Sequence, residues 1–175
     1  MEATTQQQLD ISQALATVLA RLEGEFGAKL LGSSSFRGEL TIEVAWADLP
    51  AVCLYCRDQL TFERLDSYLA NHFPARREAP FELVAHLTSV SQTLRLRLKA
   101  RLAEGDKPET LSTVWPSADW DEREIWEMFG IEFAGHPNLI RLLTVPEFEG
   151  FPLRKDFPVR GTIGGRIRRD LKGLI

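Results

Sequence analysis

The stretch WDEREIWEMFGIEFAGHP, residues 120–137, places five acids, an arginine and a histidine among large aromatic side chains. Two acids close in sequence, Glu122 and Glu124, together with His136 could serve as general acid and base. That chemistry also needs a nucleophile or a set of metal ligands, and the stretch supplies neither. A capped helix accounts for most of the same charges. Asp119 would be the N-cap, Glu122 would complete a capping box, and Gly130 would end the helix.

The cysteines and histidines offer little further chemistry. Cys53 and Cys56 form a single CxxC inside a predicted helix, without a second pair or a spaced histidine to complete a zinc site. A reactive thiolate is favoured at a helix start, so two small buried side chains are the expected reading. The histidines are scattered along the chain, and no metal site is predicted; they are His72, His86 and His136.

Composition excludes several classes of function. The chain has 175 residues, 44% of them hydrophobic and 26% charged, with a formal net charge of −4. These values favour one packed domain rather than a nucleic-acid binder. No apolar run approaches the roughly 20 residues that span a bilayer, the N-terminus has no signal-peptide pattern, and a reducing, cytoplasmic compartment is expected. Motifs typical of nucleotide binding and serine hydrolysis, GxGxxG, the P-loop and GxSxG, are absent from the sequence.

The elements that would position these side chains begin with an amphipathic helix over residues 5–24, followed by glycines at 24 and 27. Alternation from Gly38 to Trp46 predicts a strand, with which residues 29–31 could pair. Asp48 and Pro50 then predict the start of a second helix that ends near Leu60. Residues 62–73 fit either a helix or a strand by their spacing.

A hairpin is predicted next, from the alternating runs 81–88 and 94–102. The second run has leucines and an alanine on one face and a basic row on the other. This row is expected to be solvated and to protect the sheet from edge pairing, or alternatively to dock an acidic partner. Its members are Arg95, Arg97, Lys99 and Arg101. Residues 1–105 are thus predicted to form an α/β core domain with an α+β fold, in which two helices pack on a mainly antiparallel sheet.

The composition changes after residue 105. Residues 106–160 contain six prolines among tryptophans and phenylalanines, which predicts a short helix and an extended segment that wraps over a surface of its own domain or of a partner. Residues 161–175 form a basic C-terminal tail, whose partners the sequence leaves open.

Taken together, several motifs in this half resemble the C subunit of respiratory complex I, the small hydrophilic core subunit of NADH:quinone oxidoreductase. They are WPSADWDEREIWEMFGI from Trp115, HPNL from His136, LLT from Leu142 and EGFPLRKDFP from Glu149. The family signature begins at Glu122, Arg123 and Glu124 and runs through Glu127 to His136. Four residues after that histidine the family favours a basic side chain, where this chain has Ile140 followed by Arg141.

The resemblance implies a structural role. Subunits of this family carry no iron–sulfur cluster, flavin or nicotinamide themselves, and an extended C-terminal segment lies across the neighbouring quinone-site subunit. The residues implied at the family motif or interface are Glu122, Arg123, Glu124, His136, Pro137, Arg154, Lys155 and Asp156. No catalytic, cofactor-binding or metal-binding residue is expected. The resemblance also favours a strand over residues 62–73.

In that reading the holoenzyme passes electrons to a quinone, carries iron–sulfur clusters and translocates protons, and this chain sits on the cytoplasmic side of the inner membrane or on a thylakoid. Its partners would be other subunits, chiefly the quinone-site subunit, with no nucleic acid and only indirect membrane contact. The electron donor and the quinone stay open. Alternatives are the equivalent subunit of a ferredoxin:plastoquinone oxidoreductase or a membrane-bound hydrogenase, a free-standing thiol-redox protein using Cys53 and Cys56, and a nucleic-acid binder acting through the basic tail.

Overall fold

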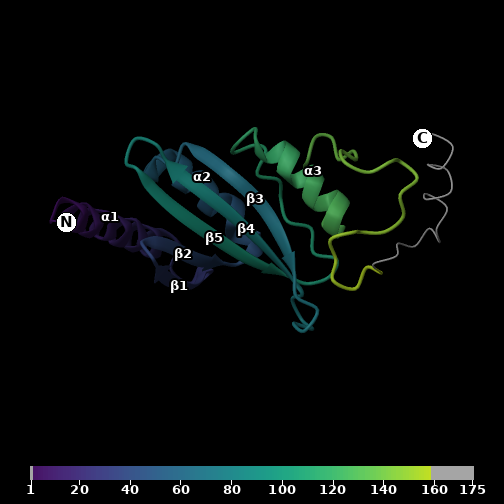
Figure 1. Cartoon of the computed structure of the whole chain (residues 1–175), viewed down its shortest axis with the longest axis horizontal. Coiled ribbons are helices and arrows are strands. Elements are labelled where there is room, and N and C mark those ends of the chain that lie inside the picture. Colours follow the sequence, from purple (N-terminus) through teal and green to yellow (C-terminus); the bar gives the residue numbers. More distant parts are fainter. Residues whose placement is uncertain (1, 159–175) are drawn as a thin grey trace.

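A computed structural model describes residues 2–158 of the chain, with side chains from residue 11 onward. Helices lie on one face of a single five-stranded sheet, and a long irregular C-terminal segment follows the last helix (Figure 1). The elements are α1 (Glu2–Phe26), η1 (Gly27–Lys29), β1 (Leu30–Phe36), β2 (Glu39–Val44), η2 (Trp46–Asp48), α2 (Leu49–Leu60), β3 (Arg64–His72), β4 (Phe81–Ser89), β5 (Leu94–Leu102) and α3 (Ala118–Phe129).

The sheet has the strand order β1-β2-β5-β4-β3. Three of its four pairings are antiparallel, and β2 pairs with β5 in parallel. The expected α+β class and the mainly antiparallel sheet are therefore confirmed. The hairpin of β4 and β5 and the second helix at 49–60 are also confirmed, and β1 is longer than the three residues expected to pair with β2.

The strand reading of residues 62–73 is confirmed over Arg64–His72, and the helical spacing there is misleading. A bulge between Leu65 and Ser67 shifts the register, so that Leu65, Tyr68 and Ala70 all face the core although their spacing is not strictly two. An apolar pattern with one extra residue looks locally like a helix turn. The segment forms a strand because it pairs with β4.

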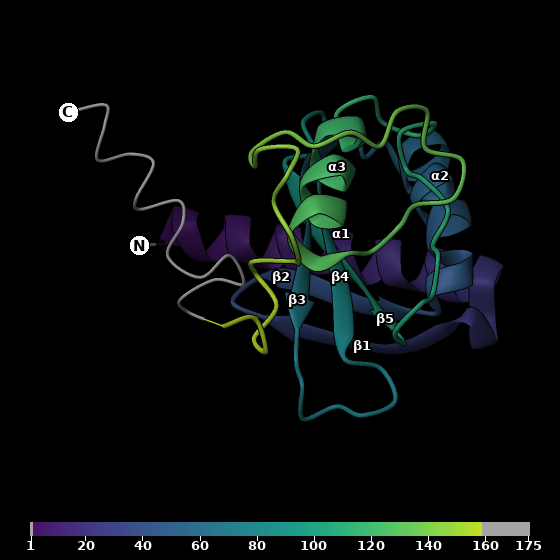
Figure 2. The same cartoon turned by 90° about the vertical axis from the view of Figure 1, so that its right-hand side faces the viewer.

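One hydrophobic core joins all three α-helices to the same face of the sheet. Leu22 of α1, Val52 of α2 and Ile125 of α3 are buried in one cluster with Ile42 and Leu98 of the central strands. The cluster continues past residue 105 through the turn at 111–115 into α3. Figure 2 shows α2 and α3 on this side of the strands, with the 73–80 loop projecting from the sheet.

The division of the chain at residue 105 and the basic tail at 161–175 remain predictions, and the tail lies outside the described residues.

The opposite face of the sheet is polar, and the basic row lies on it. Arg97 contacts Glu39 at 2.6 Å, Lys99 contacts Glu82 at 3.3 Å, and Arg101 contacts Glu43 at 2.9 Å. Three of the four basic side chains thus have carboxylate partners within the chain. These pairs favour a solvated face over a docking face for an acidic partner.

The predicted capping box at the start of α3 is wrong. The N-cap is Ser117, so that Asp119 lies inside the helix. The helix starts earlier because buried Trp115 begins a turn, in which the N–H of Ala118 donates to the Trp115 carbonyl. Glu122 consequently points into the protein. The C-terminal end is as expected, since Gly130 adopts φ 77°.

Asp48 occupies the N-cap position of α2 as expected, with Pro50 in the first turn. Its side chain makes no capping hydrogen bond there and instead pairs with Lys29 at 2.7 Å. The first helix also continues through Gly24 and ends at Phe26, where Gly27 takes φ 48°. The glycine at 27 therefore ends the helix.

Candidate functional site

The C-terminal segment, defined here as residues 136–158, is fixed to its own domain by buried polar side chains of α3. Glu127 is the centre of this attachment, with a fully buried carboxylate. It accepts the backbone N–H groups of Leu142, Leu143 and Thr144 at 2.7, 3.0 and 2.6 Å, and the hydroxyl of Thr144 as well. Burial alone would raise the pKa of Glu127, but these donors outweigh it and lower the pKa to about 2. The ionised carboxylate holds three consecutive residues of the segment.

Two arginines reinforce the same attachment. Arg123 donates from Nε to the Ile140 carbonyl at 3.1 Å, and its guanidinium lies over the Trp120 ring. Arg141 donates to the Thr144 hydroxyl and to the Phe148 carbonyl. The basic side chain that follows Ile140 thus ties the loop 141–148 together, one position later than the family pattern.

Glu122 and His136 form a second, buried contact. Both side chains are fully buried, and His136 Nε2 lies 3.2 Å from Asp119 Oδ1 and 3.8 Å from Glu122 Oε2. Glu122 accepts the N–H of Leu111 at 2.6 Å and contacts the Thr110 hydroxyl at 2.5 Å. The glutamate therefore connects α3 both to the turn before the helix and to the start of the C-terminal segment.

Burial raises the pKa of Glu122 to about 7, and the nearby Asp119 and Asp121 add to the effect. The Thr110 hydroxyl also lies 2.7 Å from the Ser112 hydroxyl, and it has only one proton to donate. A protonated Glu122 would donate to Thr110 and leave the Thr110 proton for Ser112. The raised pKa fits a structural carboxyl group, because the side chain is fully buried and both of its oxygens contact groups of the chain itself.

Arg154 attaches the far end of the segment. Its Nε donates to the Phe129 carbonyl at 2.5 Å, and its guanidinium lies over the rings of Phe81 and Phe151 and contacts Glu104 at 2.9 Å. Gly130 makes this approach possible, because a Cβ there would lie 2.6 Å from the Phe151 ring. The helix-ending glycine is thus also a packing requirement.

Lys155 and Asp156 meet the last residue of β3. The backbone N–H of Lys155 donates to Nδ1 of buried His72 at 3.0 Å, and Asp156 Oδ1 lies 3.8 Å from the same nitrogen. The His72 ring stacks on Phe81, with centroids 4.9 Å apart. The lysine and aspartate side chains themselves are exposed.

The expected motif residues therefore divide into two groups. Glu122, Arg123, His136 and Arg154 hold the chain's own segment, whereas Glu124, Pro137, Lys155 and Asp156 are exposed. Glu124 makes no hydrogen bond or ion pair with the described residues. The carboxylates of Glu122 and Glu124 therefore do not face a common site, because one is buried and the other is exposed to solvent.

Side chains outside the set expected at the family motif or interface contribute as well. Asp121 accepts the backbone N–H of Tyr68 at 2.8 Å and so ties α3 to β3. Thr110, Thr144 and His72 provide the remaining contacts described above. Asp121 and Thr144 lie inside the quoted motifs and His72 is one of the scattered histidines, but only the fold shows which distant groups they contact.

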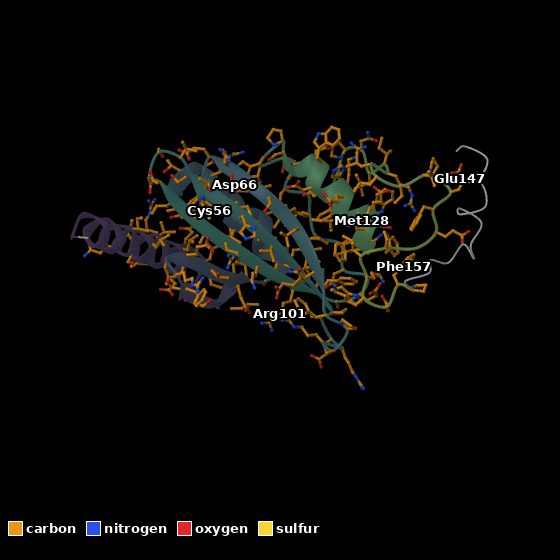
Figure 3. All side chains as sticks on the ribbon, in the orientation of Figure 1. Cys56, Asp66, Arg101, Met128, Glu147 and Phe157 are labelled. Atoms are coloured by element: carbon orange, nitrogen blue, oxygen red, sulfur yellow. The ribbon has the colours of Figure 1, made fainter. Side chains whose placement is uncertain are left out.

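The outer surface of the segment carries large apolar side chains. Those on the segment are Ile140, Leu143, Val145 and Leu153, and Trp120 of α3 adds a fifth; all are about half to two thirds exposed. Arg123 holds the Ile140 carbonyl, Glu127 holds the Leu143 N–H, and the Leu153 N–H donates to the Met128 carbonyl. Figure 3 shows Met128 on the α3 side of the segment and Phe157 and Glu147 on the segment, far from Cys56. A fixed backbone with outward apolar side chains can bind a partner at low entropic cost.

The thiols do not resemble a redox site. Cys53 and Cys56 are fully buried and unbonded in α2. Burial raises the pKa of Cys56 to about 12 and that of Cys53 well above its usual value, with the neighbouring Cys56 adding to the latter. Both thiols therefore stay protonated at neutral pH, which disfavours attack by a thiolate.

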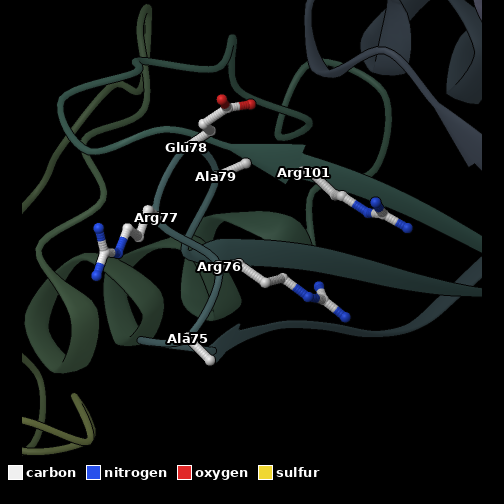
Figure 4. Close-up of a pocket in the computed structure, with 6 residues that line it drawn as sticks. All are labelled: Ala75, Arg76, Arg77, Glu78, Ala79 and Arg101. Atoms are coloured by element: carbon white, nitrogen blue, oxygen red, sulfur yellow. The ribbon is translucent and has the colours of Figure 1, made fainter.

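A hollow of about 420 Å³ lies at the 73–80 loop, lined by Arg76, Arg77 and Arg101 among others (Figure 4). The arginines do not converge on it. Arg76 pairs with Glu82 at 2.9 Å, Arg101 pairs with Glu43, and Arg77 points to the other side. The hollow is therefore a poor anion site.

Among the described side chains, those of residues 11–158, no group of three or more potential ligands (His, Cys, Asp or Glu) is placed to hold a metal ion. Among the helices described, none combines the length and the apolar character required for a membrane span.

A solved structure, "Structure of the membrane-bound sulfane sulfur reductase (MBS), an archaeal respiratory membrane complex", contains a chain with the same fold. The TM-score is 0.72 at 21% identity, and the match covers 90% of this chain and 91% of the other. At this identity the match supports the fold alone.

Proteins related in sequence match this chain at higher identity. The C subunit of the NADH-quinone oxidoreductase of Rhizobium johnstonii is 40% identical over 168 residues, covering 94% of this chain and 83% of the relative. The same subunit of Geobacter sulfurreducens is 36% identical over 142 residues, covering 81% and 88%. The model of the family "Respiratory-chain NADH dehydrogenase, 30 Kd subunit" matches residues 42–163. The chain therefore belongs to the family of the 30 Kd subunit of the respiratory-chain NADH dehydrogenase.

Proposed function

We propose that this chain is a structural subunit of the peripheral arm of a proton-translocating NADH:quinone oxidoreductase, on the cytoplasmic side of the membrane, and that it supports the quinone-site subunit. The chain itself holds no cofactor and performs no redox step. Electrons pass through iron–sulfur clusters to the quinone in other subunits. Family membership and the names of the relatives support the complex as the setting.

The observation that carries the proposal is the fixed C-terminal segment. Its backbone is held at Glu127 and Arg154, whereas Leu143 and Val145 point outward with 66% and 56% of their surface exposed. A loop without a partner gains nothing from presenting such side chains in one geometry. Exposed apolar side chains on a preorganised backbone lower the entropic cost of binding and are typical of protein–protein interaction surfaces.

The proposal predicts that the complex loses this subunit when the segment becomes charged. The test variant carries Leu143→Asp and Val145→Asp in the native complex. Val90→Asp is the matched control, because Val90 is 61% exposed at the turn between β4 and β5. We expect the test variant to separate from the complex on size-exclusion chromatography of solubilised membranes and NADH:quinone activity to fall with it, while the control stays bound. A stoichiometric, active complex with the test variant would contradict the proposal.

The partner is tested separately. A photo-crosslinking residue in place of Leu143 should join this chain to the quinone-site subunit in the purified complex. A crosslink to a different subunit alone would refute that partner while leaving the structural role intact.

A further inference from the structure

The two edges of the sheet are built differently. At β3, Asp121 of α3 accepts the Tyr68 N–H at 2.8 Å, and Arg64 pairs with Asp66 on the strand at 2.6 Å. Bulges, charges and covering elements are the usual ways in which proteins prevent further strands from pairing with an edge, and β3 has all three. The opposite edge, β1, also has a register shift, between Leu30 and Gly32, but the strand carries no charged residue.

The hydrogen-bonding pattern of β1 identifies its open peptide groups. β1 and β2 are joined by the two-residue turn Arg37–Gly38, with φ 51° and 80°, so Phe36 and Glu39 form the closing pair. Peptide groups in such a hairpin alternate between the partner and the outside. Ser34 therefore bonds to β2, whereas Ser33 and Ser35 direct their N–H and C=O groups away from it. No hydrogen bond from the described backbone, or from the side chains of residues 11–158, reaches these outward groups.

The side chains of β1 leave the edge accessible. Its sequence, LLGSSSF, contains neither a charged residue nor a proline, and every residue from Leu31 to Phe36 is exposed. Leu31 near one end and Phe36 at the other are 62% and 73% exposed. An uncharged edge with exposed apolar side chains favours the addition of a strand.

Space for the side chains of an added strand lies between α1 and β1. A hollow of about 150 Å³ there has Leu19, Leu30 and Ile42 among its lining, with Ser33 beside them. The serines at 33 and 35 lie on the same face of the hairpin as Ile42 and Leu40 of β2, because they pair with those residues. Their small size leaves part of the helix-facing side of the sheet uncovered.

The ends of this edge have opposite charges. Glu23 of α1 lines the hollow at the Leu30 end, and Arg37 lies in the turn after Phe36. Charged side chains at the two ends of an incoming segment would meet complementary partners only in one direction.

We propose that β1 binds an extended segment of another subunit of the same complex as a sixth strand. The segment is uncharged in the middle, turns alternate apolar side chains toward α1, and has a basic residue beside Glu23 and an acidic residue beside Arg37. This surface lies at the opposite end of the molecule from the C-terminal segment (Figure 1). The proposed sixth strand rests on the membership of this chain in the complex, but it does not depend on which subunit the C-terminal segment contacts.

Amide hydrogen exchange at single-residue resolution tests the strand directly. The amides of Ser33 and Ser35 should exchange at least about 100-fold more slowly in the purified complex than in the isolated chain, because they gain hydrogen bonds only in the complex. The Ser34 amide is the internal control, since β2 protects it in both. Equal exchange of Ser33 and Ser35 in the two states would overturn the proposal.

A proline variant identifies the partner's hydrogen bonds. Ser35→Pro removes one outward N–H and keeps the ladder to β2, a substitution that edge strands accept. Ser35→Ala is its matched control. A photo-crosslinking residue in place of Phe36 should join a different subunit, with the yield at least tenfold lower in Ser35→Pro and unchanged in Ser35→Ala. A crosslink only to a second copy of this chain, or equal yields in both variants, would overturn it.

Discussion

Replacing Glu127 by glutamine should release the C-terminal segment without unfolding the domain. The carboxylate accepts three backbone N–H groups and one hydroxyl, and it is the ionised form that these donors favour. An amide of the same size keeps one oxygen, but it turns an NH₂ group toward at least one of the N–H donors and removes the charge. Hydrogen bonds to a charged group contribute about 1.5–3 kcal/mol each, and the remaining oxygen retains part of that.

We therefore expect Glu127→Gln to lower the free energy of local opening by about 2–3 kcal/mol. A fall in the pKa from 4.5 to about 2 corresponds to about 3 kcal/mol and sets the upper limit. Because each 1.4 kcal/mol is a factor of ten, amide exchange at Leu142, Leu143 and Thr144 should accelerate by about 30- to 150-fold.

The control is Glu124→Gln, on the same helix with an exposed side chain. It should leave the three amides unchanged. Acceleration by less than about threefold in Glu127→Gln would refute the reasoning, because the carboxylate would then not be what holds the segment.

Three further outcomes follow from other contacts. The pKa of Glu122 is about 7 in the folded protein and about 4.5 in the unfolded chain, so between these values the folded state binds the extra proton. The free energy of unfolding should therefore fall as pH rises from about 4.5 through 7, by at most about 3 kcal/mol. Glu122→Gln should remove this dependence in urea unfolding at pH 5 and pH 8, and parallel profiles of variant and wild type would speak against it. Gly130→Ala should lower the stability measured by thermal unfolding by about 1–3 kcal/mol more than Gly105→Ala does. Both glycines have positive φ, but only Gly130 has the Phe151 ring within reach of a Cβ. Equal losses of stability in the two variants would contradict the packing argument. Cys53 and Cys56 should react with a thiol reagent only as fast as the domain unfolds, because both are buried. The control is an engineered Ser34→Cys on exposed β1, which should react at once. Rapid labelling of Cys53 and Cys56 in the native protein would contradict their burial.

The fold was predictable where the pattern is local and regular. The hairpin at 81–102 and the second helix at 49–60 carry their own periodicity and end signals, and the structure has both. Residues 64–72 and Asp119 show where local patterns fail. In the first, pairing with β4 and a bulge override the apparent helical spacing, and in the second, the burial of Trp115 moves the start of the helix.

The candidate site was predictable in its residues but not in its contacts. The resemblance singled out Glu122, Arg123, His136 and Arg154, and left open whether they act within the chain or at an interface with a neighbour. Their described partners lie within the chain and are mostly backbone groups, such as the carbonyls of Ile140 and Phe129. Backbone partners leave no side-chain signature in a sequence, so these contacts required coordinates.

The parallel pairing of β2 with β5 has a consequence for synthesis of the chain on the ribosome. Residues 40–43 have as their inner neighbours residues 96–99, more than fifty positions later. Until β5 has emerged, the α1–β1–β2–α2 part has no sheet to join, and contacts between residues so far apart close slowly. During that interval both sides of the β1–β2 hairpin are open, so nascent chains are most exposed to misassociation before residue 102 is available, and a chaperone that acts on this protein would have its greatest effect there.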